Sequence, residues 1–249
     1  MTPDQTFPEF KRHAVQPVEC LKRGWDLIKD QYWVFVGMTV VGLIIGNAVP
    51  LGILMGPMMC GLYLALLKRQ AGEVVEFGTL FKGFDFFVEG MIAGILHAIP
   101  VIIIIGPVYI VIFVAQITMM SARRNGEPDP AAAMGFLAVI GIGLPIMLIL
   151  LIILSIGFAF AFPLIVDRKL SGVNAVKHGF RAGMANFWSL FGLLLLNALL
   201  STVGVCFCFV GVYFVLPVTF AALAVAYTQV FGVAPRQALN TPPPPPTFS

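Results

Sequence analysis

Charged residues are scarce in this sequence of 249 residues, and four long stretches contain none at all. Asp, Glu, Lys and Arg make up only 11% of the chain, whereas a soluble globular domain carries about 25%. The stretches without them are residues 31–67, 90–122, 130–166 and 182–235. With 59% hydrophobic residues and a mean hydropathy of +0.96, the chain has more apolar surface than a water-soluble fold of this size can bury.

The uncharged stretches predict membrane-spanning helices. A helix needs about 20 residues to cross a hydrocarbon core of about 30 Å, so each stretch holds at least one span. Strands of a membrane barrel would instead alternate in polarity. We predict an all-α, polytopic transmembrane helix bundle with about six spans. Eight spans are the alternative, because the run 90–122 makes either one helix of about 50 Å or two short spans.

The sequence also lacks the signals of several other protein classes. The first 30 residues are polar, so we expect no cleavable secretory signal. The sequence has no stripe of aromatic and basic residues, so we expect no nucleic-acid partner. Cys206 and Cys208 form the sequence C-F-C without a nearby His or acid. We interpret them, together with Cys20 and Cys60, as packing residues or inert thiols.

Catalytic motifs are absent as well. The sequence contains no GxSxG, HExxH, Walker A or Rossmann glycine pattern, and no paired carboxylates within a span. We therefore expect a protein that is not an enzyme, with no catalytic residues, no cofactor and no bound metal.

The polar stretches divide the chain into a tail, one transmembrane domain and a second tail. We expect a disordered N-terminal tail over 1–16, a single transmembrane domain over 17–232, and a disordered proline-rich tail over 233–249 that ends in PPPPPTFS. Residues 17–31 have the apolar spacing of an amphipathic helix that lies at the membrane surface, with Trp25 at headgroup level. The phenylalanine-rich residues 80–87 suggest a further interfacial segment.

An internal repeat relates the two halves of the domain, which begin near residues 18 and 173. VECLKRGWDLIKDQYWVFVG (18–37) aligns with VNAVKHGFRAGMANFWSLFG (173–192) at a constant offset of 155. The identical pairs are Val18/Val173, Lys22/Lys177, Gly24/Gly179, Trp33/Trp188 and Gly37/Gly192. Each copy reads as an amphipathic helix that leads into a two-span hairpin. We interpret Trp33 and Trp188 as interfacial anchors, and the glycines as helix-packing residues.

The distribution of Lys and Arg predicts the orientation in the membrane. Both amphipathic helices are basic, so both should lie on the cytoplasmic surface and the repeat should be parallel. With six spans only Arg123 and Arg124 lie outside, and with eight spans no Lys or Arg does. Either number puts both termini in the cytoplasm. We expect a multi-pass protein of a bacterial cell inner membrane.

Three titratable residues are candidates for function. His97 lies inside an apolar run, where a titratable group is costly and often functional. Asp85 and Glu89 precede it and could form a polar entrance. Each has a structural alternative: His97 bonded to a carbonyl freed by Pro100, and the two carboxylates facing water at the interface.

The chain resembles bacterial membrane protein families of unknown function, similar to the membrane domain attached to some glycerophosphodiester phosphodiesterases. The matching elements are the surface helix before the first hairpin, LFKGF (80–84), FAFPLIVDRKLSGVNAVKHGF (160–180), and the final hairpin with Gly211 and Pro217. The resemblance covers most of residues 17–230 and implies a fold. It implies no catalysis, because no phosphodiesterase catalytic domain accompanies it in this sequence.

These observations support three functional hypotheses. The first is a non-enzymatic protein that organises or assists other membrane components, with the lipid bilayer, another membrane protein or a second copy of itself as partner. The alternative is a small-solute transporter or permease with a site near His97, motivated by the repeat. An intramembrane enzyme is the third, and it would require titratable groups gathered from several spans.

Overall fold

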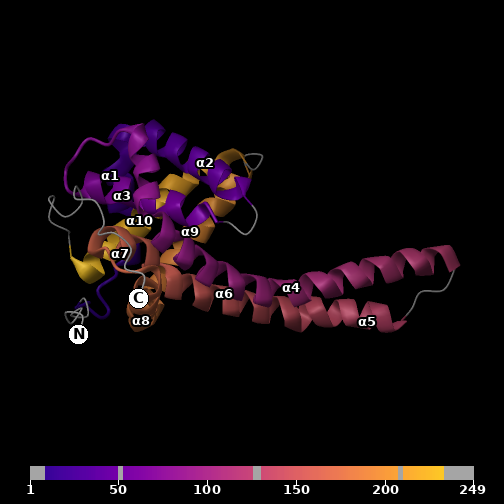
Figure 1. Cartoon of the computed structure of the whole chain (residues 1–249). Helices are drawn as coiled ribbons and strands as arrows, with labels where there is room; N and C mark the ends of the chain where they lie inside the picture. The colour runs from indigo at the N-terminus through magenta and orange to yellow at the C-terminus, as the bar shows by residue number, and fades with distance from the viewer. Residues whose placement is uncertain (1–8, 50–52, 126–129, 207–209, 233–249) are drawn as a thin grey trace. The chain divides into compact units, whose positions relative to one another are not determined.

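The computed structural model describes residues 9–49, 53–125, 130–206 and 210–232, and all regular structure in those ranges is helical (Figure 1). This confirms the prediction of an all-α fold. The elements are α1 (Pro17–Ile28), η1 (Lys29–Gln31), α2 (Tyr32–Ala48), α3 (Met55–Gln70), η3 (Phe77–Phe86), α4 (Phe87–Asn125), α5 (Pro130–Ala138), η4 (Val139–Gly143), α6 (Leu144–Phe158), α7 (Ala161–Arg168), α8 (Gly172–Ala185), α9 (Phe187–Cys206) and α10 (Val210–Phe231).

Several helices have the length and composition of membrane spans. Within the described ranges, five segments are long and apolar enough to cross a membrane: Pro17–Ala48, Phe77–Thr118, Met134–Arg168, Phe187–Val205 and Gly211–Phe231. The predicted second span corresponds to α3, which has 16 residues and is shorter than the roughly 20 that a span needs. The chain therefore has the helices of a membrane protein.

The helix boundaries bear on the number of spans. α4 is one helix of 39 residues that continues through Pro100 and Pro107, which makes it about 58 Å long. α5, the π-helical segment η4 and α6 follow one another without a non-helical residue. The eight-span alternative divides each of these two runs into two spans, so the uninterrupted helices favour the smaller number.

The range predicted to be one domain contains two compact units. One comprises residues 1–96 and 156–249, and the other comprises residues 97–155. We refer to them as the first and the second unit. The tail over 233–249, residues 1–8 and Cys208 lie outside the described residues.

The core of the first unit lies where α1, α2, α3, η3 and α10 meet. Its fully buried side chains include Ile28, Phe35, Met38, Leu66 and Leu80. Ala221 and Ala224 of α10 are buried in the same cluster, so burial of these apolar residues joins the two halves of the repeat. Cys60 is buried in α3 and Cys20 in α1, and both are free thiols.

The helix starts follow the repeat. The offset of 155 relates the start of α1 to α8, of α2 to α9, and of α3 to α10. The conserved spacing extends to packing: a Cβ atom on Gly24 would lie 2.7 Å from the backbone nitrogen of Ala222, and one on its counterpart Gly179 would lie 3.1 Å from that of Ala161. Both surface helices therefore approach a neighbouring helix backbone through glycine.

Part of the expected N-terminal tail is held against the first unit. The N–H of Lys11 donates to the carbonyl of Val230 at 2.9 Å, and the N–H of Gln16 donates to the side chain of Gln229 at 3.0 Å. Val15 is 4% exposed. Residues 9–16 thus lie along α10 rather than forming the loose segment that the sequence suggested, because backbone groups of α10 and its side-chain amide bind them.

The second unit is built from the rest of α4, α5, η4 and most of α6, and α4 runs alongside the other three in this unit (Figure 1). Large apolar side chains are exposed on α4 and α6 of this unit: Ile103 is 66% exposed, Phe113 63% and Leu148 58%. The five-residue η4 segment is π-helical, a form that usually occurs as a single-turn bulge.

Candidate functional site

The three titratable candidates have different surroundings. Asp85 is exposed on η3. Glu89, in the first turn of α4, accepts the backbone N–H of Gly172 through its carboxylate. Gly172 begins α8, and a negative charge there is favourable because the N–H groups of a helix start point toward it. Glu89 therefore has a structural role, while His97 is the partly buried first residue of the second unit. Asp85 and Glu89 belong to the first unit, and His97 belongs to the second.

The three tryptophans predicted to be interfacial anchors are exposed on the first unit, which is a requirement for contact with lipid headgroups. Trp25, Trp33 and Trp188 are 46%, 72% and 77% exposed. Around the start of α2 the rings form a chain, with centroid distances of 5.4 Å for Trp25–Tyr32, 5.7 Å for Tyr32–Trp33 and 6.0 Å for Trp33–Phe214. Trp188 pairs with Phe187 at 5.4 Å at the start of α9. Exposed aromatic groups at helix ends suit a membrane interface.

A cluster around the buried carboxylate of Asp167, which the sequence did not predict, connects the ends of α7 and α10. The side chain of Asp167 is 1% exposed, and its Oδ2 lies 3.1 Å from Arg168 Nε. The hydroxyl of Tyr227 donates to the same oxygen at 2.5 Å. Arg168 Nη2 in turn donates to the carbonyl of Phe231, the last residue of α10, at 2.9 Å. Asp167 Oδ1 has no hydrogen-bond partner among the described residues.

The chemistry of this cluster is that of a structural ion pair. A carboxylate held by a phenol and a guanidinium has no nucleophile to activate, and the described residues contain no group of three His, Cys, Asp or Glu side chains that could hold a metal ion. One sequence signal did point to Asp167, because it is the first charge after the uncharged run 130–166. Nothing in the sequence pointed to Tyr227, 60 positions further along.

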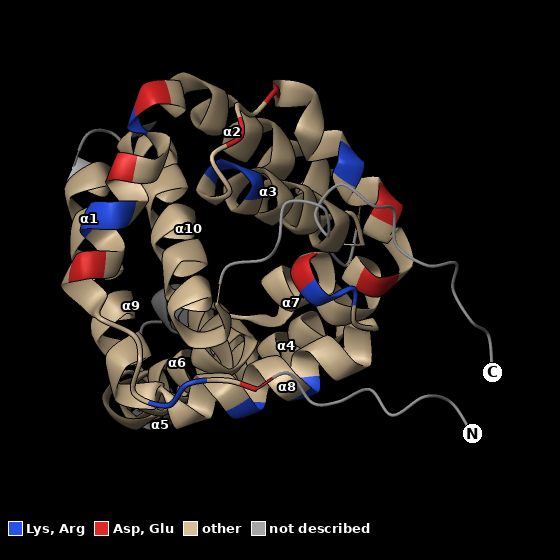
Figure 2. Cartoon of the chain, turned by 90° about the vertical axis from the view of Figure 1, so that its left-hand side faces the viewer, with Lys and Arg blue, Asp and Glu red and all other residues tan. Residues whose placement is uncertain are grey.

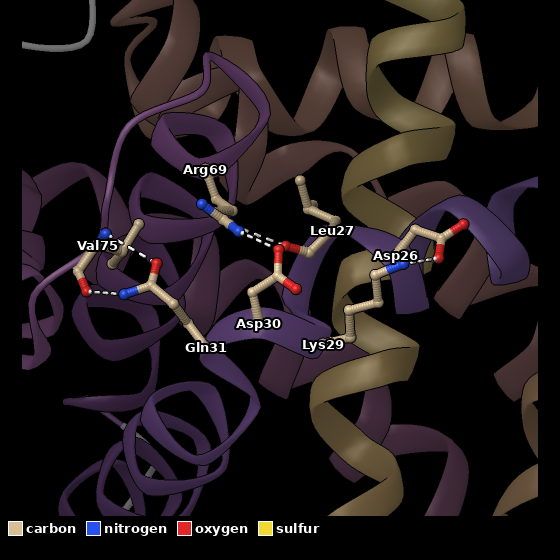
Figure 3. A network of polar contacts seen from close by, with 7 residues as sticks. All are labelled: Asp26, Leu27, Lys29, Asp30, Gln31, Arg69 and Val75. Atoms are coloured by element: carbon tan, nitrogen blue, oxygen red, sulfur yellow. Dashed lines mark hydrogen bonds and ion pairs between the residues drawn. The ribbon is translucent and has the colours of Figure 1, made fainter.

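A polar network fastens α1 to the end of the first hairpin (Figure 3). Arg69, in the last turn of α3, donates from Nε to the carbonyl of Leu27 at 3.0 Å and from Nη2 to Asp30 Oδ2 at 3.0 Å. Its side chain is 18% exposed. Arg69 thus binds a carbonyl at the C-terminal end of α1 and a carboxylate of η1.

Gln31 and Asn186 occupy equivalent positions in the repeat, where each surface helix meets the hairpin that follows it. The side chain of Gln31, the last residue of η1, donates to the carbonyl of Val75 at 2.9 Å and accepts its N–H at 3.1 Å. Its counterpart Asn186, between α8 and α9, donates to the carbonyl of Lys11 at 3.2 Å and accepts the N–H of Ala14 at 3.1 Å. The amide group of each side chain therefore hydrogen-bonds a backbone segment through both its donor and its acceptor.

The two amides bind different segments of the chain. In the first half, Gln31 bonds directly to Val75. The counterpart of Val75 at the same offset is Val230, which binds the N–H of Lys11 at 2.9 Å. In the second half, the N-terminal segment thus occupies the place between the joint amide and the end of the last helix. Residues 11–14 therefore connect Asn186 with the end of α10.

The described part of the first unit contains a small apolar cavity. A cavity between α2, α3 and α10 has a volume of about 10 Å³, and Met38, Thr39, Met58, Leu62 and Phe220 are among the residues that line it. A water molecule needs about 10–15 Å³ by the same measure. This cavity therefore has room for one water molecule at most.

No family model, curated protein or solved structure matches this chain.

Proposed function

We propose that the chain is a non-enzymatic, multi-pass protein of a bacterial inner membrane that organises or assists other membrane components through lipid or membrane-protein partners. The observation that carries this proposal is the exposed apolar surface of the second unit. In the most apolar windows of Met134–Arg168 and Phe77–Thr118, 0% and 6% of the residues are buried. Such surface needs an apolar partner, since water would leave it unfavourably hydrated.

The length of α4 supports a partner besides bulk lipid. A helix of 39 residues extends about 58 Å, roughly twice the hydrocarbon core of about 30 Å. Lipid covers the whole apolar part only if the helix tilts strongly or the bilayer adapts. A second membrane protein, or a second copy of this chain, covers the remainder otherwise.

The transporter alternative has less support. A helix broken at Pro100 or Pro107 would suit a transporter site near His97, but α4 continues through both prolines. The cavity between α2, α3 and α10 has room for one water molecule at most, so it is not a solute site. The resemblance to a membrane domain fused to an enzyme is compatible with a helper role, and it stays part of the proposal, as do the inner membrane and the cytoplasmic termini.

Native mass spectrometry of the protein released from nanodiscs of its own membrane tests the proposal. We expect a stoichiometric lipid, a second protein or a dimer on the released chain. The matched variants are Phe113→Ser on the second unit and, as control, Val74→Ser, which is 79% exposed outside the long helices. Loss of the bound species only in Phe113→Ser places it on the second unit. A bare protein that carries a small polar solute across vesicles would overturn the proposal in favour of transport.

A further inference from the structure

The two surface helices of the repeat differ in how their charges are neutralised. In α1 and η1, three acidic residues accompany three basic ones. Each acid is paired: Glu19 with Arg23 at 2.5 Å, Asp26 with Lys29 at 2.8 Å, and Asp30 with Arg69 at 3.0 Å. The first copy therefore presents a surface of largely compensated charge.

None of these acidic residues has an acidic counterpart in the second copy. At the offset of 155, Asn174, Arg181 and Ala185 stand where α1 and η1 have Glu19, Asp26 and Asp30. α8 contains no acidic residue, and Figure 2 shows only basic segments on it, whereas α1 carries both signs. Lys177 and Arg181 are exposed and form no ion pair with the described residues. The charge of α8 is thus uncompensated.

An apolar stripe lies beside these charges. Val173, Phe180 and Met184 are 56%, 39% and 41% exposed. With Lys177 they follow a 4-3-4 spacing, which places them on one helix face. Trp188, 77% exposed, follows at the same spacing beyond the end of α8. A face that combines basic residues with exposed apolar ones is what a helix at a lipid headgroup boundary needs.

The N-terminal segment adds further basic residues. Asn186 binds the backbone of residues 11 and 14 and so holds this segment at the end of α8. Lys11 and Arg12 are exposed and are without an ion pair among the described residues. Glu9 is the only acidic residue in the described part of this segment. We call Lys11, Arg12, Lys177 and Arg181 the basic face.

We propose that the basic face and the apolar stripe of α8 bind the headgroups of anionic phospholipids, and that α1 has no such preference. The proposal rests on the proposed membrane function and on the cytoplasmic placement of α8, since the cytoplasmic leaflet is the anionic one. The headgroup phosphates meet the uncompensated cations, while the acyl boundary covers Val173, Phe180 and Met184.

Tryptophan quenching by brominated lipids tests this on the full-length protein. The variant Trp25→Phe/Trp33→Phe keeps Trp188 as the only tryptophan, and it is reconstituted into phosphatidylcholine vesicles containing brominated phosphatidylglycerol or brominated phosphatidylcholine. We expect phosphatidylglycerol to bind beside Trp188 more tightly than phosphatidylcholine does, and therefore to quench its fluorescence more strongly. Each basic residue near an anionic surface contributes about 5-fold, hence about 30-fold for Lys177 and Arg181 together.

Matched variants separate the basic face from general electrostatics. Lys177→Gln/Arg181→Gln should abolish the preference, and Lys177→Arg/Arg181→Lys should retain it. Arg23→Gln/Lys29→Gln, which removes two cations from the compensated α1, should leave it unchanged. Equal quenching by brominated phosphatidylcholine in all variants shows that they are folded alike.

Three results would overturn the inference: no preference for phosphatidylglycerol at Trp188, a preference that survives Lys177→Gln/Arg181→Gln, or an equal loss in the α1 control. None of them bears on the partner sought on the second unit, which is measured separately with Phe113→Ser. Added salt should weaken the preference without changing quenching by brominated phosphatidylcholine, because exposed charges are screened.

Discussion

Asp167 places a carboxylate in the interior of the first unit, where its side chain is 1% exposed. Burying a carboxylate is costly unless hydrogen bonds and an opposite charge compensate for lost water. Tyr227 and Arg168 supply both to one oxygen. The same guanidinium binds the last carbonyl of α10, so a single buried carboxylate connects two helix ends.

Replacement of Tyr227 by Phe should weaken that connection. Asp167 would lose a hydroxyl donor with no water to replace it, and we expect the free energy of unfolding to fall by about 1–3 kcal/mol. Tyr213→Phe is the control, because Tyr213 is 45% exposed on the same helix. Denaturant titration of the purified protein in detergent measures both. Equal effects of the two changes would contradict a structural role for the ion pair.

His178 reports on the basic face of α8. Partial burial lowers the pKa of His178 below its ordinary value of 6.5, and the charges of Lys177 and Arg181 lower it further. Because the protonated ring is disfavoured in the folded protein, its contribution to stability is present above about pH 6.5 and is lost as the pH falls below that value.

Removing the two neighbouring charges should therefore raise the pKa of His178 toward its ordinary value. Titration of carbon-13-labelled histidine by NMR in Lys177→Gln/Arg181→Gln measures the change. The remaining burial keeps some of the lowering. Arg23→Gln on α1 serves as the comparison and should leave this pKa where it is. A pKa that stays constant in the double variant would show that Lys177 and Arg181 lie too far from the ring.

At the scale of elements, the two halves of the repeat connect the surface helix to the following span through different backbone partners. A surface helix must be joined to a span, and the break between them leaves backbone groups that need partners. Gln31 and Asn186 stand at equivalent joints and use the same amide chemistry. The first binds a segment of its own half, and the second binds the N-terminal segment.

Alanine substitution at the two joints should therefore have different consequences. Gln31→Ala leaves the N–H and carbonyl of Val75 unsatisfied at a residue that is 3% exposed, and we expect a loss of about 2 kcal/mol in stability. Asn186→Ala should release residues 11–14, which hydrogen exchange at the amide of Ala14 detects as faster exchange.

Asn47→Ala is the control for both, since Asn47 is exposed and its amide donates to Leu43, one turn earlier in the same helix. Unchanged exchange at Ala14 in Asn186→Ala would mean that the contact of Lys11 with Val230 is sufficient to hold the segment.

At the scale of the whole molecule, the distribution of exposed apolar residues determines which solvent the chain can occupy. The helices of the second unit expose apolar side chains along their length, and the first unit has exposed tryptophans where two of its helices begin. Lipid suits both features. The side of the membrane that the loop with Arg123 and Arg124 faces depends on the number of spans.

Cysteine labelling in intact cells distinguishes the two span numbers. In a cysteine-free background, Glu127→Cys should react with an impermeant maleimide from the periplasm if there are six spans, because the loop then lies outside. Ser249→Cys should react only after permeabilisation under either number. Protection of Glu127→Cys in intact cells would support eight spans, and reaction of Ser249→Cys in intact cells would contradict a cytoplasmic C-terminus.

The sequence by itself determined the class of protein, the all-α fold, the surface helices and the repeat. These follow from hydropathy and from spacing along a helix, which act over neighbouring residues. The uncharged runs also indicated helices in the right places. The sequence left open whether 90–122 is one helix, since proline weakens a helix without always ending it.

Only the tertiary structure decided which polar groups meet. Asp167 and Tyr227, Gln31 and Val75, and Asn186 and Lys11 lie far apart along the chain, and hydropathy gives no signal for such pairs. Their contacts depend on how helices from both halves pack, because a hydrogen bond forms only when packing brings its two atoms within about 3 Å. The same holds for the ion pair of Asp30 with Arg69, whereas the other two ion pairs of α1 join residues three or four positions apart.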